Sequence, residues 1–477
     1  MNSLNKNTTQ KSILPVRILQ FGEGNFLRAF ADWMIDILNE KADYQSGVAV
    51  VQPIPHGMVA KLREQDGLYH HLLRGLADGK IVDQARLIKC IMECVNPFEE
   101  QDRFFAQARN EDLRIVISNT TEAGIKFNES DIPNPGELAE TFPGKLAQLL
   151  KERFDHFAGT PESGLVFIPC ELIDRNGDKL KEVILNYSEI WNYPEEFVHW
   201  LDHHNHFGNT LVDRIVPGFP GDEIEEIQQK IGYRDELVVS SESFHLWVIE
   251  GPKEIEEAFP ATKVSLNVKF VPDMEPYRTR KVKILNGAHT AMVPIGLLAG
   301  IETVREAVED ETIGRFIRDI LFDEIIPTID MPEHELNAFA EDIIERFRNP
   351  FIRHELKSIS LNSISKFKVR VLPSLIGYFK LKQQLPKGLV LALGGLIKLY
   401  LSPAFEPRDD RKNLAFLNNV KTQSASNEDL VEAILGNTSF WDVDLNTIPG
   451  LTREVLSILD ALDIGSTRNL LAAQKHE

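Results

Sequence analysis

The first half of the chain alternates between short apolar runs and longer segments in which apolar residues recur every three or four positions. The apolar run at 16–21 leads into two glycines and then into a helical pattern over 25–39, and a second apolar run at 47–51 completes a strand–helix–strand unit. This alternation predicts a mainly parallel sheet covered by helices. The predicted strands are 16–21, 47–51, 68–73, 114–118, 164–169 and 211–216, and the predicted helices are 25–39, 98–108, 143–157 and 179–191.

The pattern changes near Pro272 and Pro276, beyond which helical spacing dominates and β-branched runs are few. The second half is therefore predicted to be mostly α-helical, and a crevice between the two parts is the expected binding site. The predicted helices are 282–299, 303–322, 335–348, 352–366 and 389–401, with solvated loops at 406–413 and 422–427.

Composition and charge remove several classes of protein. The 43% hydrophobic and 26% charged residues are ordinary for a globular protein, which excludes disordered, collagen-like and small disulfide-stapled chains. The 52 Lys and Arg against 72 Asp and Glu give a net charge of −20, which disfavours nucleic acid and anionic membranes but allows an anionic metabolite in a locally basic cleft. The polar N-terminus has no signal-peptide core, and the apolar run at 388–397 is too short to span a bilayer.

Three cysteines, Cys90, Cys94 and Cys170, are too few for a disulfide framework. They predict a reducing compartment, the cytoplasm. Cys90 and Cys94 are expected to be structural thiols, because no second pair of Cys or His residues has zinc-ligand spacing.

Gly22 and Gly24 stand between the first predicted strand and helix, where glycine lets the backbone approach a pyrophosphate at a helix N-terminus. Leu27 occupies the place of the usual third glycine, so the motif is a fragment and a plain tight turn is the alternative. Gln52 follows the second strand in place of the usual ribose-binding acid, which leaves NAD and NADP both open. The polar loop at 118–124 is expected at the same sheet edge, although a helix cap or turn explains it equally well.

Lys281, Asn286 and His289 lie at the start of the helical half. A separation of eight residues brings Lys281 and His289 onto one helix face. A partly desolvated lysine among the cations at 278, 280 and 283 would have a lowered pKa and could act as a general base, while Asn286 and His289 could hold a carbonyl or alkoxide oxygen. A solvated basic helix is the alternative.

His203 and His206, with Asp202, form the one cluster that raises a metal hypothesis, which would imply a metal-dependent epimerase or lyase. A helix C-terminus also favours His, and no metal is expected. Further on, a basic segment is expected to be mainly solvated, with one or two members suited to a carboxylate substrate. Its members are Arg346, Arg348, Arg353, His354, Lys357, Lys366, Lys368 and Arg370.

Taken together, these motifs resemble the polyol-specific long-chain dehydrogenase family, typified by mannitol dehydrogenase, from Arg17 to about Leu451. The Val-Asp-Arg-Ile sequence at 212–215 and the Lys-x4-Asn-x2-His pattern that begins at Lys281 are specific to that family in this order. The other matching segments are 20–30, 118–124, 169–177 and 346–350.

The resemblance implies an α/β chain with an N-terminal Rossmann-type, doubly wound domain over 1–272, a mostly α-helical domain over 273–477, and metal-independent hydride transfer with NAD. It gives Lys281 the role of the acid/base and Asn286 and His289 that of holding the reacting oxygen. The implied substrate-binding residues are Asp213, Asn176, Lys366 and Arg346. The implied cofactor-binding residues are Phe21, Gly22, Gly24, Asn25, Phe26, Arg28, Asn119, Thr120, Thr121 and Glu122.

The chain departs from polyol-oxidising relatives at two places. Glu171 and Leu172 replace an Asp-Asn pair, so that the oxyanion-holding Asn is lost or supplied by Asn176, and Ser358 stands where a substrate arginine is expected. Both departures fit a substrate that is not mannitol. The resemblance implies a uronate, with NADH reduction of D-tagaturonate to D-altronate together with the reverse oxidation. Fructuronate or a polyol is the alternative substrate, and a nucleotide-binding sensor without turnover is a further alternative. A monomer or small homo-oligomer is expected.

Overall fold

The computed structural model describes residues 1–121, 123–134, 136–465 and 467–473. The chain divides into two compact units, Met1–Met274 and Glu275–Glu477. The division falls two residues after the predicted domain boundary at 272 and 273.

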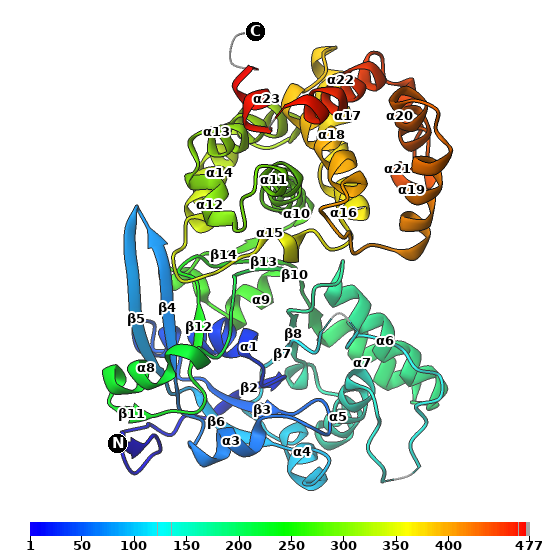
Figure 1. The fold of residues 1–477 in the computed structure, drawn as a ribbon. Coiled ribbons are helices and arrows are strands. Elements are labelled where there is room, and N and C mark those ends of the chain that lie inside the picture. Colours follow the sequence, from blue (N-terminus) through cyan, green and yellow to red (C-terminus); the bar gives the residue numbers. More distant parts are fainter. Residues whose placement is uncertain (122, 135, 466, 474–477) are drawn as a thin grey trace. The chain divides into compact units, whose positions relative to one another are not determined.

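A six-stranded sheet, parallel throughout, forms the centre of the first unit (Figure 1). Its strand order is β6-β3-β2-β7-β8-β9, so that the order reverses between β2 and β7. This is the doubly wound arrangement, in which ligands bind outside the carboxyl ends of the strands at the point of reversal. The predicted fold class is therefore confirmed. The strands are β2 (Val16–Phe21), β3 (Gly47–Val51), β6 (Ile91–Val95), β7 (Ile115–Ser118), β8 (Val166–Pro169) and β9 (His206–Phe207).

Both faces of this sheet are buried, which explains why its strands are continuous apolar runs. Ile18 on β2 faces a core shared with Phe30, Trp33 and Trp247. Leu19 faces the opposite core, which also holds apolar residues of α4 to α7. The helices of the unit are α1 (Asn25–Ala29), α2 (Ala31–Lys41), α3 (Val59–Glu64), α4 (Gln101–Ala108), α5 (Phe142–Phe157), α6 (Asn176–Ile190), α7 (Glu195–His204), α8 (Ile224–Ile231) and α9 (Lys253–Ala258).

The first unit also holds antiparallel pairs that the sequence analysis did not foresee. β4 and β5 form a long hairpin, visible in blue in Figure 1, and its turn residues Asp78 and Gly79 both have positive φ. An Asp-Gly pair favours this kind of turn, so a signal was present. The predicted strand at 211–216 was assigned to the parallel sheet, but β10 pairs antiparallel with β13 in a separate sheet. The bounds are β4 (Tyr69–Ala77), β5 (Lys80–Ile88), β10 (Asn209–Asp213), β12 (Val239–Ser241), β13 (Leu246–Glu250) and β14 (Val268–Val271), with a short pair of β1 (Asn2–Ser3) and β11 (Tyr233–Arg234).

The second unit is helical, as predicted. Two predicted helices are each divided. The helix expected over 303–322 breaks at Asp310, whose carboxylate accepts backbone hydrogen bonds from Thr312 and Ile313 and so begins a new helix. The helix expected over 352–366 breaks at Asn362, which has a left-handed φ of 54°. The loop expected over 406–413 is shorter, because a helix begins at Arg411.

Two glycines let one of these helices, α18 (Lys387–Leu401), pack closely against two neighbours. A Cβ at Gly395 on α18 would lie 2.7 Å from Ile295 on α11, and one at Gly394 would lie 2.6 Å from Ile458 on α22.

None of the helices in the described residues combines the length and hydropathy that a bilayer crossing needs. The α-helices are α10 (Glu275–Arg280), α11 (Gly287–Leu298), α12 (Val304–Glu309), α13 (Glu311–Asp319), α14 (Glu333–Phe347), α15 (Leu356–Ile359), α16 (Ser363–Arg370), α17 (Leu372–Lys382), α18 (Lys387–Leu401), α19 (Arg411–Gln423), α20 (Asn427–Leu435), α21 (Thr438–Trp441), α22 (Leu451–Ile464) and α23 (Thr467–Ala473).

Candidate functional site

The two predicted cofactor loops meet where the strand order reverses. The Gly22 N–H donates to the carbonyl of Val51, and the Asn119 N–H donates to the carbonyl of Phe21. Gly22 has φ of +115°, and a Cβ there would lie only 2.8 Å from the carbonyl oxygen of Asn119. Glycine is therefore required at this position, because the backbone conformation and the neighbouring carbonyl both exclude a side chain.

Gly24 caps the N-terminus of α1 and differs from Gly22 in its surroundings. Its φ is −67°, and no atom lies within 4 Å of the position that a Cβ would take. The open space above the first helical turn fits a pyrophosphate, to which the turn's N–H groups can donate. Asn25 is exposed and Phe26 is half-buried beside this space.

Two of the predicted cofactor-binding side chains point into the protein. Phe21 is fully buried and packs its ring against Phe104 and Phe142. Arg28 is also buried, and its guanidinium donates to the carbonyls of Glu23 and Leu237 and to the side chain of Asn25. The side chains of Phe21 and Arg28 therefore support the glycine turn at 22–24 from the protein interior.

Glu171 anchors the second cofactor loop. Its carboxylate, 2% exposed, accepts hydrogen bonds from the Ser118 hydroxyl at 3.0 Å, the Thr120 N–H at 3.0 Å and the Thr120 hydroxyl at 2.9 Å. Burial raises the pKa of Glu171. Glu171 thus ties the end of β7 to the end of β8. Thr121 has a positive φ of 76° and is exposed, whereas Glu122 lies outside the described residues.

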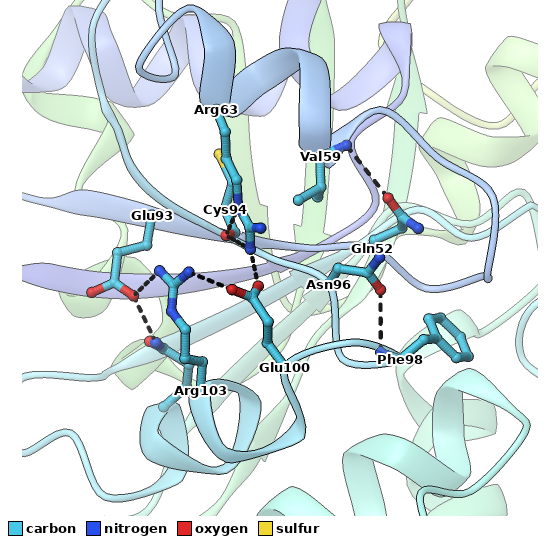
Figure 2. Close-up of polar contacts among 10 residues, drawn as sticks. Gln52, Val59, Arg63, Glu93, Cys94, Asn96, Phe98, Glu100 and Arg103 are labelled. Atoms are coloured by element: carbon cyan, nitrogen blue, oxygen red, sulfur yellow. Dashed lines mark hydrogen bonds and ion pairs between the residues drawn. The ribbon is translucent and has the colours of Figure 1, made fainter.

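The end of β3 carries a neutral amide in place of an acid. Gln52 is buried, its amide donates to the carbonyls of Ile54 and Pro55, and its oxygen accepts from the Val59 N–H (Figure 2). Figure 2 also shows Arg63 donating to the Cys94 carbonyl and pairing with Glu100. The Arg63 guanidinium, near the end of β3, is therefore already paired with the Glu100 carboxylate.

The Val-Asp-Arg-Ile segment at 212–215 spans the end of β10. Asp213 is the last residue of β10 and is 5% exposed. The next residue, Arg214, is buried over the ring of Trp33 and donates to the carbonyls of Ala29 and Glu242. Burial lowers the pKa of Arg214 to about 9. Arg214 thus connects β10 to the junction of α1 and α2.

Asn176 is fully buried at the start of α6. Its NH2 group donates to the carbonyls of Pro169 and Glu171, and its oxygen accepts from the Thr210 N–H at 2.8 Å. These bonds give Asn176 a structural role between β8 and β10. Its predicted contact with substrate stays a prediction. Leu172, where relatives carry Asn, is 65% exposed.

Lys281–Asn286 form a π-helical turn between α10 and α11. Five residues of an α-helix turn the chain through about 140° beyond a full turn, which would set Lys281 and Asn286 on different sides. In a π-helix, hydrogen bonds run from i to i+5, so residue i+5 lies about one turn from residue i. The wide turn therefore brings Lys281 and Asn286 to the same side. The sequence analysis expected a regular helix and did not predict this turn.

His289 is the most enclosed of the three residues. It is 8% exposed, stacks on Phe347 at a ring distance of 4.3 Å, and meets His354 edge-on at 5.0 Å. Burial first, and then the neighbouring His354 and Arg346, hold its pKa well below the usual range, so the ring is neutral. Its buried Nε2 has no hydrogen-bond partner among the described residues. Such a group is costly unless a ligand satisfies it.

Predicted substrate residues surround this histidine. Arg346, 8% exposed, and Lys366 both act on the pKa of His289. The Lys366 ammonium donates to the Ile359 carbonyl at 2.9 Å, and burial lowers its pKa. The second unit therefore gathers His289, Arg346 and Lys366 about one point. Lys281, half-buried, lies at the start of the helical stretch that contains His289.

The histidines of α7 and its C-terminus are engaged in other contacts. Asp202 pairs with Lys181 at 2.5 Å, and His203 stacks on His199 and shares a hydrogen bond with its carbonyl. Within the part of the chain that the structure describes, no three His, Cys, Asp or Glu side chains are placed to hold a metal ion.

Comparisons with known proteins cover the whole chain. Residues 16–266 match the mannitol dehydrogenase Rossmann domain, and residues 273–463 match the mannitol dehydrogenase C-terminal domain. An altronate oxidoreductase of Phocaeicola vulgatus is 46% identical over 472 residues, and one of Escherichia coli is 44% identical over 471 residues. Each alignment covers 97% of this chain and 97% of the relative.

Two solved structures share the fold at low sequence identity. A substrate-free D-sorbitol dehydrogenase has a TM-score of 0.80 at 19% identity, covering 98% of this chain and 100% of that one. Mannitol 2-dehydrogenase of Pseudomonas fluorescens, in a ternary complex with NAD and D-mannitol, has a TM-score of 0.69 at 20% identity, with full coverage of both chains.

Proposed function

The chain belongs to the mannitol dehydrogenase family, and from that premise we propose that it is an NAD-dependent oxidoreductase that interconverts D-tagaturonate and D-altronate. The observation that carries the proposal is the 44–46% identity to altronate oxidoreductases over 97% of the chain. The two expected departures from polyol-oxidising relatives, at 171–172 and at Ser358, fit a substrate other than mannitol. The three buried free thiols support the predicted cytoplasmic location.

The first unit would hold the cofactor. The open space above Gly24 and the paired loops at Gly22 and Asn119 suit a dinucleotide pyrophosphate. When bound, NAD supplies the hydride acceptor, or NADH the hydride donor. Gln52 is uncharged and would not repel the 2′-phosphate of NADP. Arg63 would not attract that phosphate either, because its guanidinium is already paired with Glu100. This arrangement, and the NAD of the Pseudomonas relative's complex, support NAD over NADP.

Proton transfer is assigned to the second unit. Lys281 exchanges a proton with the reacting hydroxyl, and it must be neutral to accept that proton during oxidation. Asn286 and the unsatisfied Nε2 of His289 hold the developing alkoxide, since polar groups already placed in a water-poor site stabilise such charge by about 3–4 kcal/mol for one donor. Because His289 is neutral, it contributes a hydrogen bond without adding a charge that would trap the ionised oxygen.

The function is tested with a substrate panel of tagaturonate, fructuronate, fructose and mannitol, each with NADH or NAD and with NADPH or NADP. We expect tagaturonate with NADH to have the highest kcat/KM, and activity to persist in a chelator. Reduction of fructuronate or fructose at a higher kcat/KM would refute the substrate assignment.

The role of Lys281 is tested by Lys281→Ala, which should lower kcat at least 100-fold and leave the NADH Kd within twofold of wild type. Lys283→Ala is the comparison, since the Lys283 ammonium donates to the Thr328 carbonyl and has no assigned contact with the reacting oxygen, so its kcat should fall far less than that of Lys281→Ala. Equal losses of turnover and cofactor affinity in Lys281→Ala would indicate a structural lysine instead.

A further inference from the structure

Helix α16 presents two cations on one side of the second unit. Lys366 and Arg370 are four residues apart, which places them one above the other on the helix surface. Both are half-buried, and both act on the pKa of the enclosed His289. Lys368 lies between them in sequence but turns elsewhere and pairs with Asp442 at 3.0 Å.

Arg370 differs from three buried arginines of the first unit in that no acceptor for its guanidinium lies in the described part of the chain. Arg28, Arg153 and Arg214 each donate to backbone carbonyls. No carboxylate or carbonyl accepts a hydrogen bond from the Arg370 guanidinium among the residues that the structure describes. The half-buried guanidinium has five N–H donors, and none of them is among the fully buried unpartnered atoms of the described residues, so they are open to solvent and to a ligand.

The backbone places Arg370 beside the residues assigned to proton transfer. A Cβ at Gly287 would lie 3.1 Å from the carbonyl oxygen of Arg370, so the end of α16 abuts the start of α11. His289, whose Nε2 is also without a partner, follows two residues later on α11. A buried imidazole nitrogen without a partner and a guanidinium with no acceptor among the described residues therefore lie on adjoining elements.

We propose that Arg370, together with Lys366, binds the carboxylate of the sugar acid and so selects a uronate over a neutral ketose. This inference rests on the proposed function. A planar guanidinium pairs with a carboxylate through two parallel hydrogen bonds, a geometry that an ammonium does not offer. Lys366 already donates to the Ile359 carbonyl, which leaves Arg370 as the principal contact and Lys366 as its electrostatic support.

The test compares substrates that differ only in the charged group. D-Tagatose carries a CH2OH group where D-tagaturonate carries a carboxylate. Arg370→Gln should lower kcat/KM for tagaturonate by about 10- to 100-fold, the loss expected for hydrogen bonds to a charged group, and change that for tagatose by less than about threefold. Arg370→Lys should retain part of the selectivity. Lys368→Gln removes one charge from the same helix and should leave the ratio of the two kcat/KM values unchanged.

A binding measurement separates this inference from the proposed function. In the wild type, D-altronate should raise the thermal unfolding midpoint and neutral altritol should not, whereas Arg370→Gln should lose the altronate effect. If the wild type reduces no sugar acid, the proposed function fails, and the altronate shift still decides the assignment of Arg370. An unchanged acid-to-neutral ratio in Arg370→Gln, an equal loss in Lys368→Gln, or the same altronate shift with and without Arg370 would overturn the assignment.

Discussion

Gly22 and Gly24 are two residues apart, yet the structure predicts opposite consequences for the same substitution at each. Gly22→Ala forces an L-residue to φ of +115°, and its Cβ would meet the Asn119 carbonyl oxygen at 2.8 Å. A backbone held in such a region costs about 1–3 kcal/mol, and the displaced carbonyl adds to that cost. We therefore expect Gly22→Ala to lower the free energy of unfolding by about 1–3 kcal/mol or more. We also expect it to weaken NADH binding, because both cofactor loops would shift.

Gly24→Ala serves as the matched comparison. Its φ of −67° is open to alanine, and no atom lies within 4 Å of the new Cβ. Its stability should be unchanged or higher by less than about 1 kcal/mol, since alanine lowers the entropy of the unfolded chain. Its methyl group would nevertheless occupy the space proposed for the pyrophosphate, so the NADH Kd should rise at least tenfold.

Urea unfolding followed by tryptophan fluorescence reports mainly on the first unit, which holds four of the five tryptophans (33, 191, 200 and 247). NADH binding is measured by titrating the quenching of the same fluorescence. Wild-type stability in Gly22→Ala would refute the backbone argument. Wild-type NADH affinity in Gly24→Ala would show that the phosphates bind elsewhere.

Three further substitutions test other contacts. Glu171→Gln replaces one acceptor oxygen of the loop anchor with a donor, and should raise the NADH Kd about tenfold and lower the free energy of unfolding by about 1–3 kcal/mol. Burial raises the pKa of Glu324 to about 7 from the ordinary 4.5, so the folded state binds this proton more tightly and wild-type stability should fall as pH rises from about 5 to 7; Glu324→Gln should reduce that fall by about 2–3 kcal/mol. Gly395→Ala places a methyl 2.7 Å from Ile295 and should cost about 1–3 kcal/mol by overpacking.

Each of these has an outcome that contradicts it. Exposed Asp323 is next to Glu324 and adds less than burial does to the raised pKa of Glu324, so Asp323→Asn should reduce the fall in stability less than Glu324→Gln does. A larger change in Asp323→Asn would locate the titration at the wrong carboxylate. Unaltered NADH affinity in Glu171→Gln would mean that the loop does not contact the cofactor. A Gly395→Ala protein as stable as wild type would show that the end of the Ile295 side chain can move aside at no cost.

The parallel sheet could be predicted from the sequence because each of its strands is marked by residues that are close together in the chain. Strands buried on both faces are continuous apolar runs, as at 47–51, and the glycine turn marks the first strand's end. The assignment of 211–216 to that sheet was wrong, because its partner β13 begins more than 30 residues later and only long-range pairing identifies it.

The candidate site was predicted in its residues but not in its geometry. Lys281, Asn286 and His289 were identified from their spacing, whereas the wide turn that aligns two of them depends on one extra residue within a helix, which has no signature in a single sequence. Arg370 was identified only as one of a basic segment. Its spacing of four from Lys366 was visible, but its lack of a partner is a property of the folded chain.

The wide turn at Lys281–Asn286 also affects which length changes the chain can accept. Loss of a single amino acid from 282–285 would let the segment relax into an ordinary α-helix with its apolar residues still available. Four steps of an α-helix turn the chain through about 400°, close to what the five steps from Lys281 to Asn286 cover in the wide turn, so the three side chains would stay on one side. Loss of a second residue would turn His289 away from Lys281 by about 100°. We therefore expect a one-residue deletion within 282–285 to retain turnover and a two-residue deletion to abolish it, even in a variant that remains fully folded.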